Sequence, residues 1–392
     1  MKLLSPLLVL IVALLAGCAT TGGPEPASQL PPDMQGTPAV QGTPALPERK
    51  PELPPLSERE VRAMDAKLLP PGVKDRSGWA TDLHAAFVNL GFPHLPPIYC
   101  AAIAVIEQES SFQADPVVPG LPDIVWRELE QRGKKYGIPK LLISAAMLKG
   151  SPDGRSYSQR IDSLKTEKQL NALFADMIAE LPAGKQLFAG YNPVRTGGPM
   201  QVSVEFAEQH ASDQPYPYPR AGTIRDEVFT RRGGLYFGSA ILLDYPAPYD
   251  DVAYRFADFN AGRYSSRNAA FQSALAGLSG KPLTLDGDLL RYQGGKAIEQ
   301  PSSVEIALRS LGRRLGLNAG EIRRDLLLEK AASFGQSPSF NRLYALADKT
   351  AGRPLTRQLM PQIDLKSPKI TRKLTTEWFA RRVEGRYRTC LT

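Results

Sequence analysis

The sequence is poor in the residues that bind metals. It has three cysteines and three histidines in 392 residues, and the histidines, His84, His94 and His210, are widely separated along the chain. No two cysteines have the CxxC spacing. Because zinc sites need grouped Cys and His ligands, we expect no metal site and no bound cofactor. The G-x-S-x-G motif of many serine hydrolases is also missing.

Long apolar runs are scarce as well. The only marked one, residues 3–16, follows Met1-Lys2 and is too short to span a bilayer. It has the form of the apolar part of a signal peptide. It ends in the stretch LAGC at 15–18, which resembles the bacterial lipobox, where the signal is cut before the cysteine and the thiol receives lipid. We therefore expect a lipoprotein signal peptide over residues 1–17 and lipidation of Cys18.

The residue after this cysteine and the net charge predict a location. Residue 19 is Ala and not Asp, which in lipoprotein families implies transfer to the outer membrane. Lys and Arg outnumber Asp and Glu by 48 to 40, a net charge of +8, and this excess favours anionic surfaces such as wall polymers or phospholipid headgroups. We expect no nucleic acid partner outside the cytoplasm. The expected protein is held in the outer membrane by lipid and faces the periplasm.

Residues 18–56 have a composition that cannot form a core. They are rich in Pro, Gly, Thr and Ala and contain the repeat QGTPAVQGTPAL. Such a segment behaves as an extended tether. Folding signals begin at Ser57. We expect a domain over 57–295, with an insertion at about 113–197, and a helical region over 296–392.

Helical patterns dominate the folded part. Helical segments are predicted around 76–91, 94–112, 123–137, 165–184, 233–245 and 250–262. Beyond about residue 295, helix starts are marked by Asn318, Ser337 and Ser367. The last helix is expected to carry a core stripe of Ile370, Leu374, Trp378 and Phe379. Strand signals are scarce, and the best hairpin candidate is NPVRTGGPMQVS at 192–203. The expected fold class is mainly α with a small β-hairpin.

Two glutamates stand where a helix is about to be buried. In AVIEQESSFQADP, residues 104–116, Glu107 and Glu109 end an apolar run. A carboxyl keeps its proton near neutral pH only if desolvation raises its pKa, and cleavage of a glycosidic bond needs such a proton. Either glutamate is a candidate acid, the other reading being a solvated helix edge. Glu109 is favoured because it directly precedes Ser-Ser-Phe.

Three further motifs follow in order, namely GGPMQVS at 197–203, GGLYFGSAILLDY at 233–245 and RFADFNAGRY at 255–264. With the Glu-Ser-Ser-Phe helix end, they resemble the lysozyme-like lytic transglycosylases. In that family an ES-x-F helix end, a G-L-M-Q turn, a glycine-containing helix and an A-Y-N-A-G segment occur in this order. The resemblance covers about residues 95–275 and implies a lysozyme-like helical domain. The whole chain also resembles a family of bacterial envelope lipoproteins that share this core.

The resemblance implies roles residue by residue. Glu109 matches the catalytic glutamate, and the implied substrate is the glycan strand of peptidoglycan. In such enzymes the sugar's own 6-hydroxyl closes a 1,6-anhydro ring, so one carboxyl serves first as acid and then as base. The substrate-binding positions implied in the same way are Ser110, Met200, Gln201, Phe259 and Asn260.

Departures from the family pattern keep two other functions open. The segment between the first two motifs is far longer than usual, Pro199 replaces a Leu, and Phe259 replaces a Tyr whose hydroxyl helps to position the glutamate. A wall-binding scaffold that has lost efficient catalysis is one alternative. The other is a hydrolase that uses Asp258 or Glu205 as a second carboxylate, although Asp258 is better explained as a solvated helix residue.

Two smaller expectations concern packing. Gly234 and Gly238, four residues apart, predict a close approach to their helix. Cys100 and Cys390 form an even pair in an oxidising compartment, so we expect a disulfide between them, and the alternative is two isolated thiols.

Overall fold

The computed structural model describes residues 58–183, 187, 190, 192–293, 295–365 and 373–392. The expected signal peptide, the tether and Cys18 lie outside these residues, as do Ser57, Ser367 and Ile370. Within the described residues the fold is mainly helical, as the sequence predicts. None of the helices described is both long and apolar enough to cross a membrane.

The first part of the chain forms three helices and then an insertion. The opening helices are α2 (Glu58–Leu68), α3 (Arg76–Leu90) and α4 (Pro96–Ser110). The insertion contains α5 (Leu121–Lys135), α6 (Lys140–Met147), α7 (Tyr157–Asp162) and α8 (Glu167–Ala179).

A hairpin and five helices follow. They are β1 (Thr196–Gly197), β2 (Val202–Ser203), α10 (Val204–Asp213), α11 (Ile224–Val228), α12 (Arg231–Leu243), α13 (Val252–Ala261) and α14 (Ser265–Ser279). In the predicted hairpin, Thr196 pairs with Ser203 and Gly197 with Val202.

The C-terminal part begins with a second hairpin. It contains β3 (Tyr292–Gln293), β4 (Lys296–Ala297), α15 (Ser303–Ser310), α16 (Gly312–Leu315), α17 (Ala319–Leu326), the 3-10 helix η2 (Ala332–Gln336), α18 (Pro338–Ala351), β5 (Asp364–Leu365), β6 (Leu374–Thr375) and α19 (Thr376–Leu391). The pairs β3–β4 and β5–β6 were not predicted. Leu374 lies in β6, so the expectation that it belongs to the last helix is wrong. Thr375 ends that strand and caps α19 through its hydroxyl.

Local capping explains why these helices begin and end where they do. The side chains of Thr166 and Gln169 form a capping box at the start of α8, and Asn318 and Glu321 do the same for α17. The α3 helix ends at Gly91, whose φ of 67° suits glycine. Because each cap involves residues only a few positions apart, these boundaries can be read from sequence.

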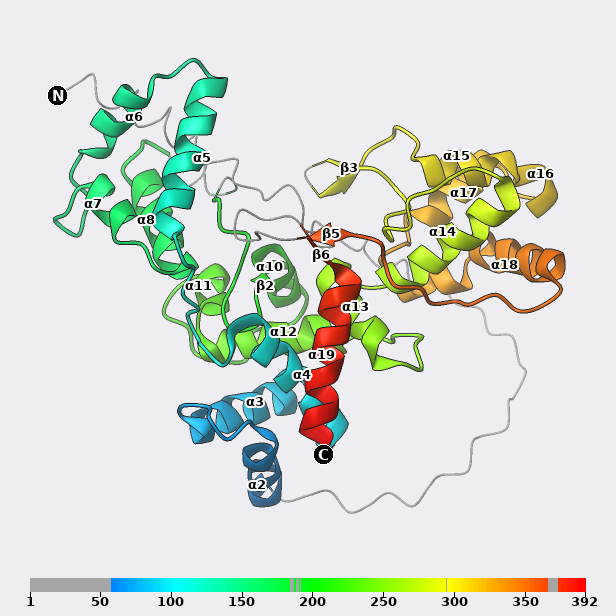
Figure 1. Cartoon of the computed structure of the whole chain (residues 1–392), viewed down its shortest axis with the longest axis horizontal. Helices are drawn as coiled ribbons and strands as arrows, with labels where there is room; N and C mark the ends of the chain where they lie inside the picture. The colour runs from blue at the N-terminus through cyan, green and yellow to red at the C-terminus, as the bar shows by residue number, and fades with distance from the viewer. Residues whose placement is uncertain (1–57, 184–186, 188–189, 191, 294, 366–372) are drawn as a thin grey trace.

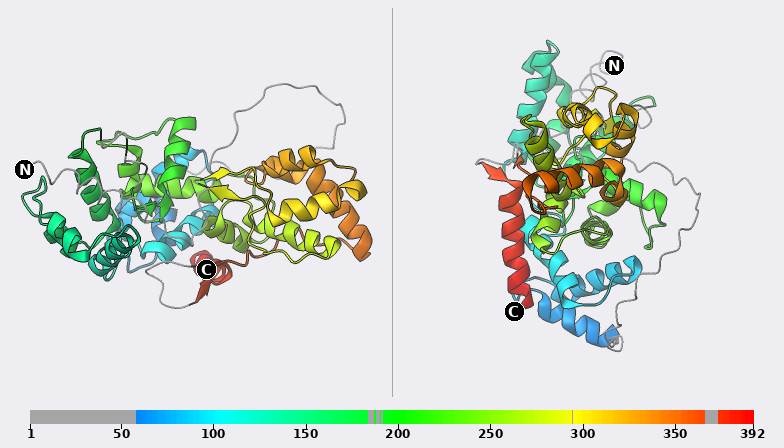
Figure 2. Two further views of the ribbon diagram at one scale, coloured as in Figure 1. Left: turned by 90° about the horizontal axis from the view of Figure 1, so that it is seen from above. Right: turned by 90° about the vertical axis from the view of Figure 1, so that its right-hand side faces the viewer.

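The described chain packs around three hydrophobic cores. The first joins α2, α3, α4, the β1–β2 hairpin, α10, α12, α13 and α19. The second belongs to the insertion and runs from Val118 to Val194, with the addition of Phe229, which lies just before α12. The third runs from Phe271 in α14 to Ala347 in α18. The insertion and the helices α14 to α18 stand at opposite ends of the molecule, with the first core between them (Figures 1 and 2).

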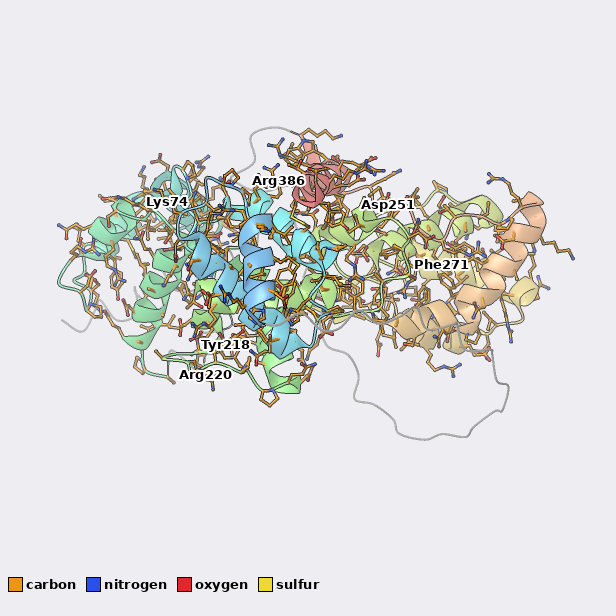
Figure 3. The ribbon with its side chains drawn as sticks, turned by 90° about the horizontal axis from the view of Figure 1, so that it is seen from below. Lys74, Tyr218, Arg220, Asp251, Phe271 and Arg386 are labelled. Atoms are coloured by element: carbon orange, nitrogen blue, oxygen red, sulfur yellow. A yellow bond between two sulfur atoms is a disulfide. The ribbon has the colours of Figure 1, made fainter. Side chains whose placement is uncertain are left out.

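These cores correct the expected boundary at residue 295. Phe271 already belongs to the third core, whereas Phe379 and Val383 of α19 belong to the first. Figure 3 shows Phe271 among the C-terminal helices and Arg386 on the separate α19. The last helix therefore returns to the first core. Its return depends on packing between distant segments, which no local sequence pattern encodes.

A disulfide fastens this returning helix. Cys100 of α4 and Cys390 of α19 are bonded, with 5.6 Å between their Cα atoms and 290 residues between them in sequence. Near the other end of α4, Gln108 accepts a hydrogen bond from Arg382, which lies eight residues before Cys390 in α19. The two contacts together show that the helices run antiparallel.

Candidate functional site

The end of α4 places Glu109 at a sharp change of chain direction. Helical residues 99–106 are buried, and the helix stops at Ser110. Ser111 and Phe112 both adopt left-handed conformations, with φ of 50° and 60°. The Phe112 ring packs edge-on against Trp79, with 5.3 Å between centroids. This contact compensates for two non-glycine residues in an uncommon conformation, and it leaves the half-buried Glu109 one residue before the helix ends.

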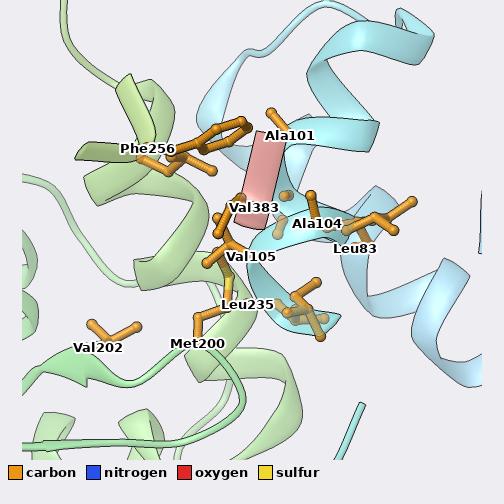
Figure 4. Packing of buried hydrophobic residues seen from close by; sticks show 14 of the residues in the cluster. Leu83, Ala101, Ala104, Val105, Met200, Val202, Leu235, Phe256 and Val383 are labelled. Carbon is orange, nitrogen blue, oxygen red and sulfur yellow. The ribbon is translucent and has the colours of Figure 1, made fainter. Parts of the chain in front are cut away.

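Glu107 and Glu109 face different sides of α4. Glu107 lies 3.8 Å from the Arg386 guanidinium of α19. Two residues further on, Glu109 is rotated by about 200° around the helix axis, and so it does not face α19. It shares a face with Val105, four residues earlier. Val105, Met200 and Leu235 lie together in the first core (Figure 4), so Glu109 continues the α4 face that meets the hairpin.

The hairpin turn sits tightly on α12 because two glycines leave room for it. A Cβ atom at Gly234 would lie 2.4 Å from Cδ of Pro199, and one at Gly238 would lie 2.4 Å from Sδ of Met200. Real carbon atoms do not approach so closely. The close approach predicted for this glycine pair is present, and its partner is the turn that carries Gln201.

Two of the expected substrate-binding residues are buried, and one of them, Met200, belongs to the first core. Met200 is completely buried. Ser110 is buried too, and its hydroxyl donates to the Ile106 carbonyl at 3.0 Å. Both side chains are thus engaged in packing or at the helix end, and their contact with substrate stays a prediction. Met200 packs against Gly238 of α12, and Ser110 bonds to the backbone at the end of α4, which explains why these residue types stand at these positions.

Gln201 remains half-exposed in the turn, with φ of 49°. Its amide nitrogen donates to Glu167 at 3.2 Å and makes a long contact with the Gly198 carbonyl at 3.4 Å. Its amide oxygen accepts from the Thr196 hydroxyl at 3.4 Å. Both amide protons are thus engaged, while the oxygen keeps one lone pair. Gln201 can therefore serve a ligand as an acceptor.

The insertion supplies the residues that sequence reasoning missed at this site. Glu167 is the first residue of α8 and reaches Gln201 across the seam between insertion and hairpin. The neighbouring Thr166 hydroxyl donates to Asp115 at 2.9 Å, and the Val118 amide donates to the Lys165 carbonyl at 2.8 Å. Burial raises the pKa of Asp115. The capping box at Thr166 marks a helix start, but no local signal indicates that this start meets Gln201.

The last motif ends next to α19. The side-chain oxygen of Asn260 accepts from the Thr376 hydroxyl at 2.8 Å. Phe259 is half-buried and packs against the first core. Asn260 is therefore held by the returning helix, and Phe259 offers no hydroxyl. Neither of these contacts involves Glu109.

Comparisons with known proteins cover most of the chain. Residues 72–392 match the family described as "Protein of unknown function (DUF1615)". The chain belongs to this family. It is also 48% identical over 332 residues, 85% of this chain and 90% of the relative, to "Uncharacterized protein YaiW" of Escherichia coli (strain K12). No solved structure matches the chain.

In this member of the DUF1615 family, Asp258 is not a solvated residue. It is 1% exposed and accepts hydrogen bonds from the hydroxyl of Tyr249 and the amides of Tyr264 and Ser266, each at 2.7 Å. The Tyr245 hydroxyl is a fourth donor, at 3.2 Å. Burial raises the pKa of Asp258 to about 6. The carboxyl joins α13 to the start of α14 and cannot reach a bulky glycan, which removes it as a second catalytic carboxylate.

The other candidate for a second carboxylate, Glu205, is exposed in the first turn of α10.

The structure also brings two of the separated histidines together. The rings of His84 and His94 lie 5.1 Å apart between centroids, and the Tyr99 hydroxyl lies 2.7 Å from Nδ1 of His94. Among the described residues of this DUF1615 protein, no group of three or more His, Cys, Asp or Glu side chains could hold a metal.

Cavities of about 450 to 460 Å³ lie between α14 and α18, beside α10 and α11, and between α5 and α6. Glu109 lines none of these three. The candidate site of this family member is the group formed by the end of α4, the hairpin turn and the start of α8, where Gln201 meets Glu167, and it lies outside these three cavities.

Proposed function

We propose that this protein cleaves the glycan strands of peptidoglycan as a lytic transglycosylase. The observation that carries the proposal is the common packing of the four motifs. The end of α4, the hairpin turn, α12 and α13 all contribute to the first core. Glu109 lies on the α4 face directed at the turn that presents Gln201. A half-buried glutamate at a helix end and an acceptor amide in the hairpin turn would supply an acid and a hydrogen-bond acceptor to a glycan-cleaving site.

Glu109 would serve as acid and then as base. Its carboxyl would donate a proton to the glycosidic oxygen as the bond to the anomeric carbon breaks, while the substrate's acetamido group stabilises that carbon. The resulting carboxylate would then take the proton of the 6-hydroxyl as its oxygen bonds to the anomeric carbon. The products are a free 4-hydroxyl on one strand and a 1,6-anhydro sugar on the other. Gln201 would accept a hydrogen bond from a sugar hydroxyl or acetamido N–H.

The test replaces Glu109 by Gln, which preserves size and polarity but removes the transferable proton. We expect the release of anhydro-muropeptides from purified sacculi to fall by about 10² to 10⁴. Glu107→Gln is the matched control on the same helix, and it should retain most activity because Glu107 faces Arg386. Product analysis by mass spectrometry measures both. Equal activity of wild type and Glu109→Gln would remove Glu109 from the mechanism.

A wall-binding scaffold is the second candidate function. It is favoured by Phe259, which lacks the hydroxyl of the family's tyrosine, and by the engagement of both Gln201 amide protons with Glu167 and Gly198. The same sacculus experiment separates the functions. A scaffold binds sacculi and releases nothing. A hydrolase that uses Glu205 releases reducing ends and not anhydro sugars.

The proposal includes anchoring at the periplasmic face of the outer membrane through lipid on Cys18. The stretch LAGC at 15–18 and Ala19 support it. The segment 18–56 would then let the folded part reach the cell wall.

A further inference from the structure

The α6 helix has two apolar faces, and only one of them is covered. Ile143, Ala146 and Met147 are buried in the insertion core. On the opposite side, Leu141 and Leu148 are 78% and 69% exposed. At about 100° per residue, positions 141, 145 and 148 fall within a sector of roughly 60°. The residue between the two leucines on that face is Ala145, so the exposed stripe is apolar throughout.

Two further large apolar side chains close to α6 in the sequence are exposed. Leu142 is 45% exposed, and Tyr136, just after α5, is 63% exposed. Large apolar side chains gathered in this way on a short segment differ from singly scattered ones, which need no explanation. We call residues 134–149 the α6 tip. It lies at the end of the insertion, far from α14 to α18 (Figures 1 and 2).

The same segment carries more positive than negative charge. The stretch QRGKKYGIPKLLISAAMLK, residues 131–149, contains five Lys or Arg and no Asp or Glu. Three of these five are ion-paired, Arg132 with Glu128 at 3.5 Å, Lys140 with Glu130 at 2.6 Å, and Lys149 with Glu180. Lys134 and Lys135 are exposed, and within the described parts of the chain they have no ion-pair partner. The tip therefore carries unneutralised cations next to exposed leucines.

We propose that the α6 tip is a membrane-docking surface that binds a bilayer with anionic phospholipid headgroups. Leucines on one helix face enter the acyl boundary, a tyrosine sits at headgroup depth, and lysines reach the phosphates. A second copy of this chain is a poor occupant, because two such tips would bring like charges together. The surface does not depend on any activity at Glu109, and it is separate from lipid on Cys18.

The experiment uses the full chain on vesicles that contain a phospholipid with a photoreactive acyl chain. One set of vesicles contains phosphatidylglycerol, and the other contains phosphatidylcholine alone. After illumination, mass spectrometry compares labelling of peptides from 134–149 with labelling of α15 peptides. The label is measured on each peptide separately. Attachment of the protein to vesicles through lipid on Cys18 would therefore change the labelling of both peptides alike and leave their ratio unchanged. We expect several-fold more label in the α6 tip on the anionic vesicles.

Matched variants complete the test. Leu141→Glu with Leu148→Glu should reduce tip labelling to the level of α15. The control is Ile306→Glu on α15, which alters a side chain that is 51% exposed. This variant should leave the labelling of the α6 tip unchanged. Lys134→Gln with Lys135→Gln should weaken tip docking roughly fivefold per lysine. Circular dichroism and thermal unfolding check that each variant is folded.

Three outcomes would overturn the proposal. The first is tip labelling no greater than that of α15 on anionic vesicles. The second is equal tip labelling on anionic and neutral vesicles, which would exclude headgroup recognition. The third is self-association in sedimentation, lost in the Leu141 and Leu148 variant and unaccompanied by tip labelling, which would make a second copy the occupant.

Discussion

Glu329 shows how strongly a single buried carboxyl depends on its surroundings. It is completely buried and accepts hydrogen bonds from the Leu289 amide and the Tyr292 hydroxyl. Burial raises its pKa to about 8, in spite of those donors and the nearby Lys330. Its backbone carbonyl oxygen also accepts from Arg267 at 2.6 Å, so the residue ties α14 to the segment that follows α17.

This raised pKa predicts a pH-dependent stability. Below about 4.5 the carboxyl is protonated in both the unfolded and the folded state, and its contribution is complete. As the pH rises toward 8, the unfolded chain releases its proton while the folded chain keeps it, so the free energy of unfolding falls. Above about 8 both states are ionised and the loss is complete. The expected loss is on the order of a few kcal/mol.

Glu329→Gln isolates this contribution, because its amide can accept from Leu289 and donate to Tyr292 without titrating. Urea unfolding at pH 5 and pH 9 should show a smaller difference in the variant than in wild type. Asp258, whose raised pKa lies near 6, is present in both proteins. Its contribution to the pH dependence of unfolding is therefore the same in each. An identical pH dependence in the two proteins would mean that Glu329 does not titrate in this range.

At the scale of elements, the contact between the hairpin turn and α12 depends on missing side chains. Gly238 faces the Met200 sulfur at a distance that admits no Cβ. At Gly277 in α14, by contrast, no atom lies within 4 Å of the position that a Cβ would occupy. The same substitution at these two helical glycines should therefore have opposite effects.

Gly238→Ala should lower the free energy of unfolding by about 1 to 3 kcal/mol through overpacking. Gly277→Ala should raise it by about 0.5 to 1 kcal/mol, because alanine loses less backbone entropy in a helix. Chemical denaturation of both variants measures the difference. A loss of stability in Gly277→Ala as large as that in Gly238→Ala would show that the hairpin contact does not govern this pair.

At the scale of the whole molecule, α19 links the end of the chain to its first core. Besides the Cys100–Cys390 bond, the Arg382 guanidinium donates to Gln108 at 3.1 Å. Thr376 at the other end of α19 donates to Asn260. The chain therefore leaves the first core after α13, forms the third core, and comes back to the first core as α19. As a result, α19 packs against the end of α4 that carries Glu109.

The proposed anchor predicts where the whole molecule resides. Cys18→Ser removes the thiol that would accept lipid, so the protein should leave the outer-membrane fraction after a salt wash. Acyl chains supply about 0.8 kcal/mol per buried CH₂, which the α6 tip alone would not replace. Membrane fractionation with immunodetection measures this. Retention of Cys18→Ser in the washed membranes would contradict lipidation at this position.

Sequence alone predicted the features that depend on neighbours in the chain. Helix starts at Asn318 and Ser337 follow from caps that span three residues. The hairpin at 196–203 follows from Gly197-Gly198, and the position of Glu109 at a helix end follows from the apolar run before it. Each of these rests on interactions within one turn of backbone, so no knowledge of the remaining chain is needed.

Tertiary packing decided which of those residues remain available for chemistry. Met200 is buried by α12, Asp258 by four donors around the start of α14, and the Gln201 amide is engaged by Glu167 from the insertion. α19 joins the first core across 290 residues, as the disulfide shows. The residues that bury a side chain or bond to it come from segments tens to hundreds of positions away in the sequence. Their contacts contribute free energy only once the fold has brought them together. The periodicity of a single segment carries no information about which distant segment that will be.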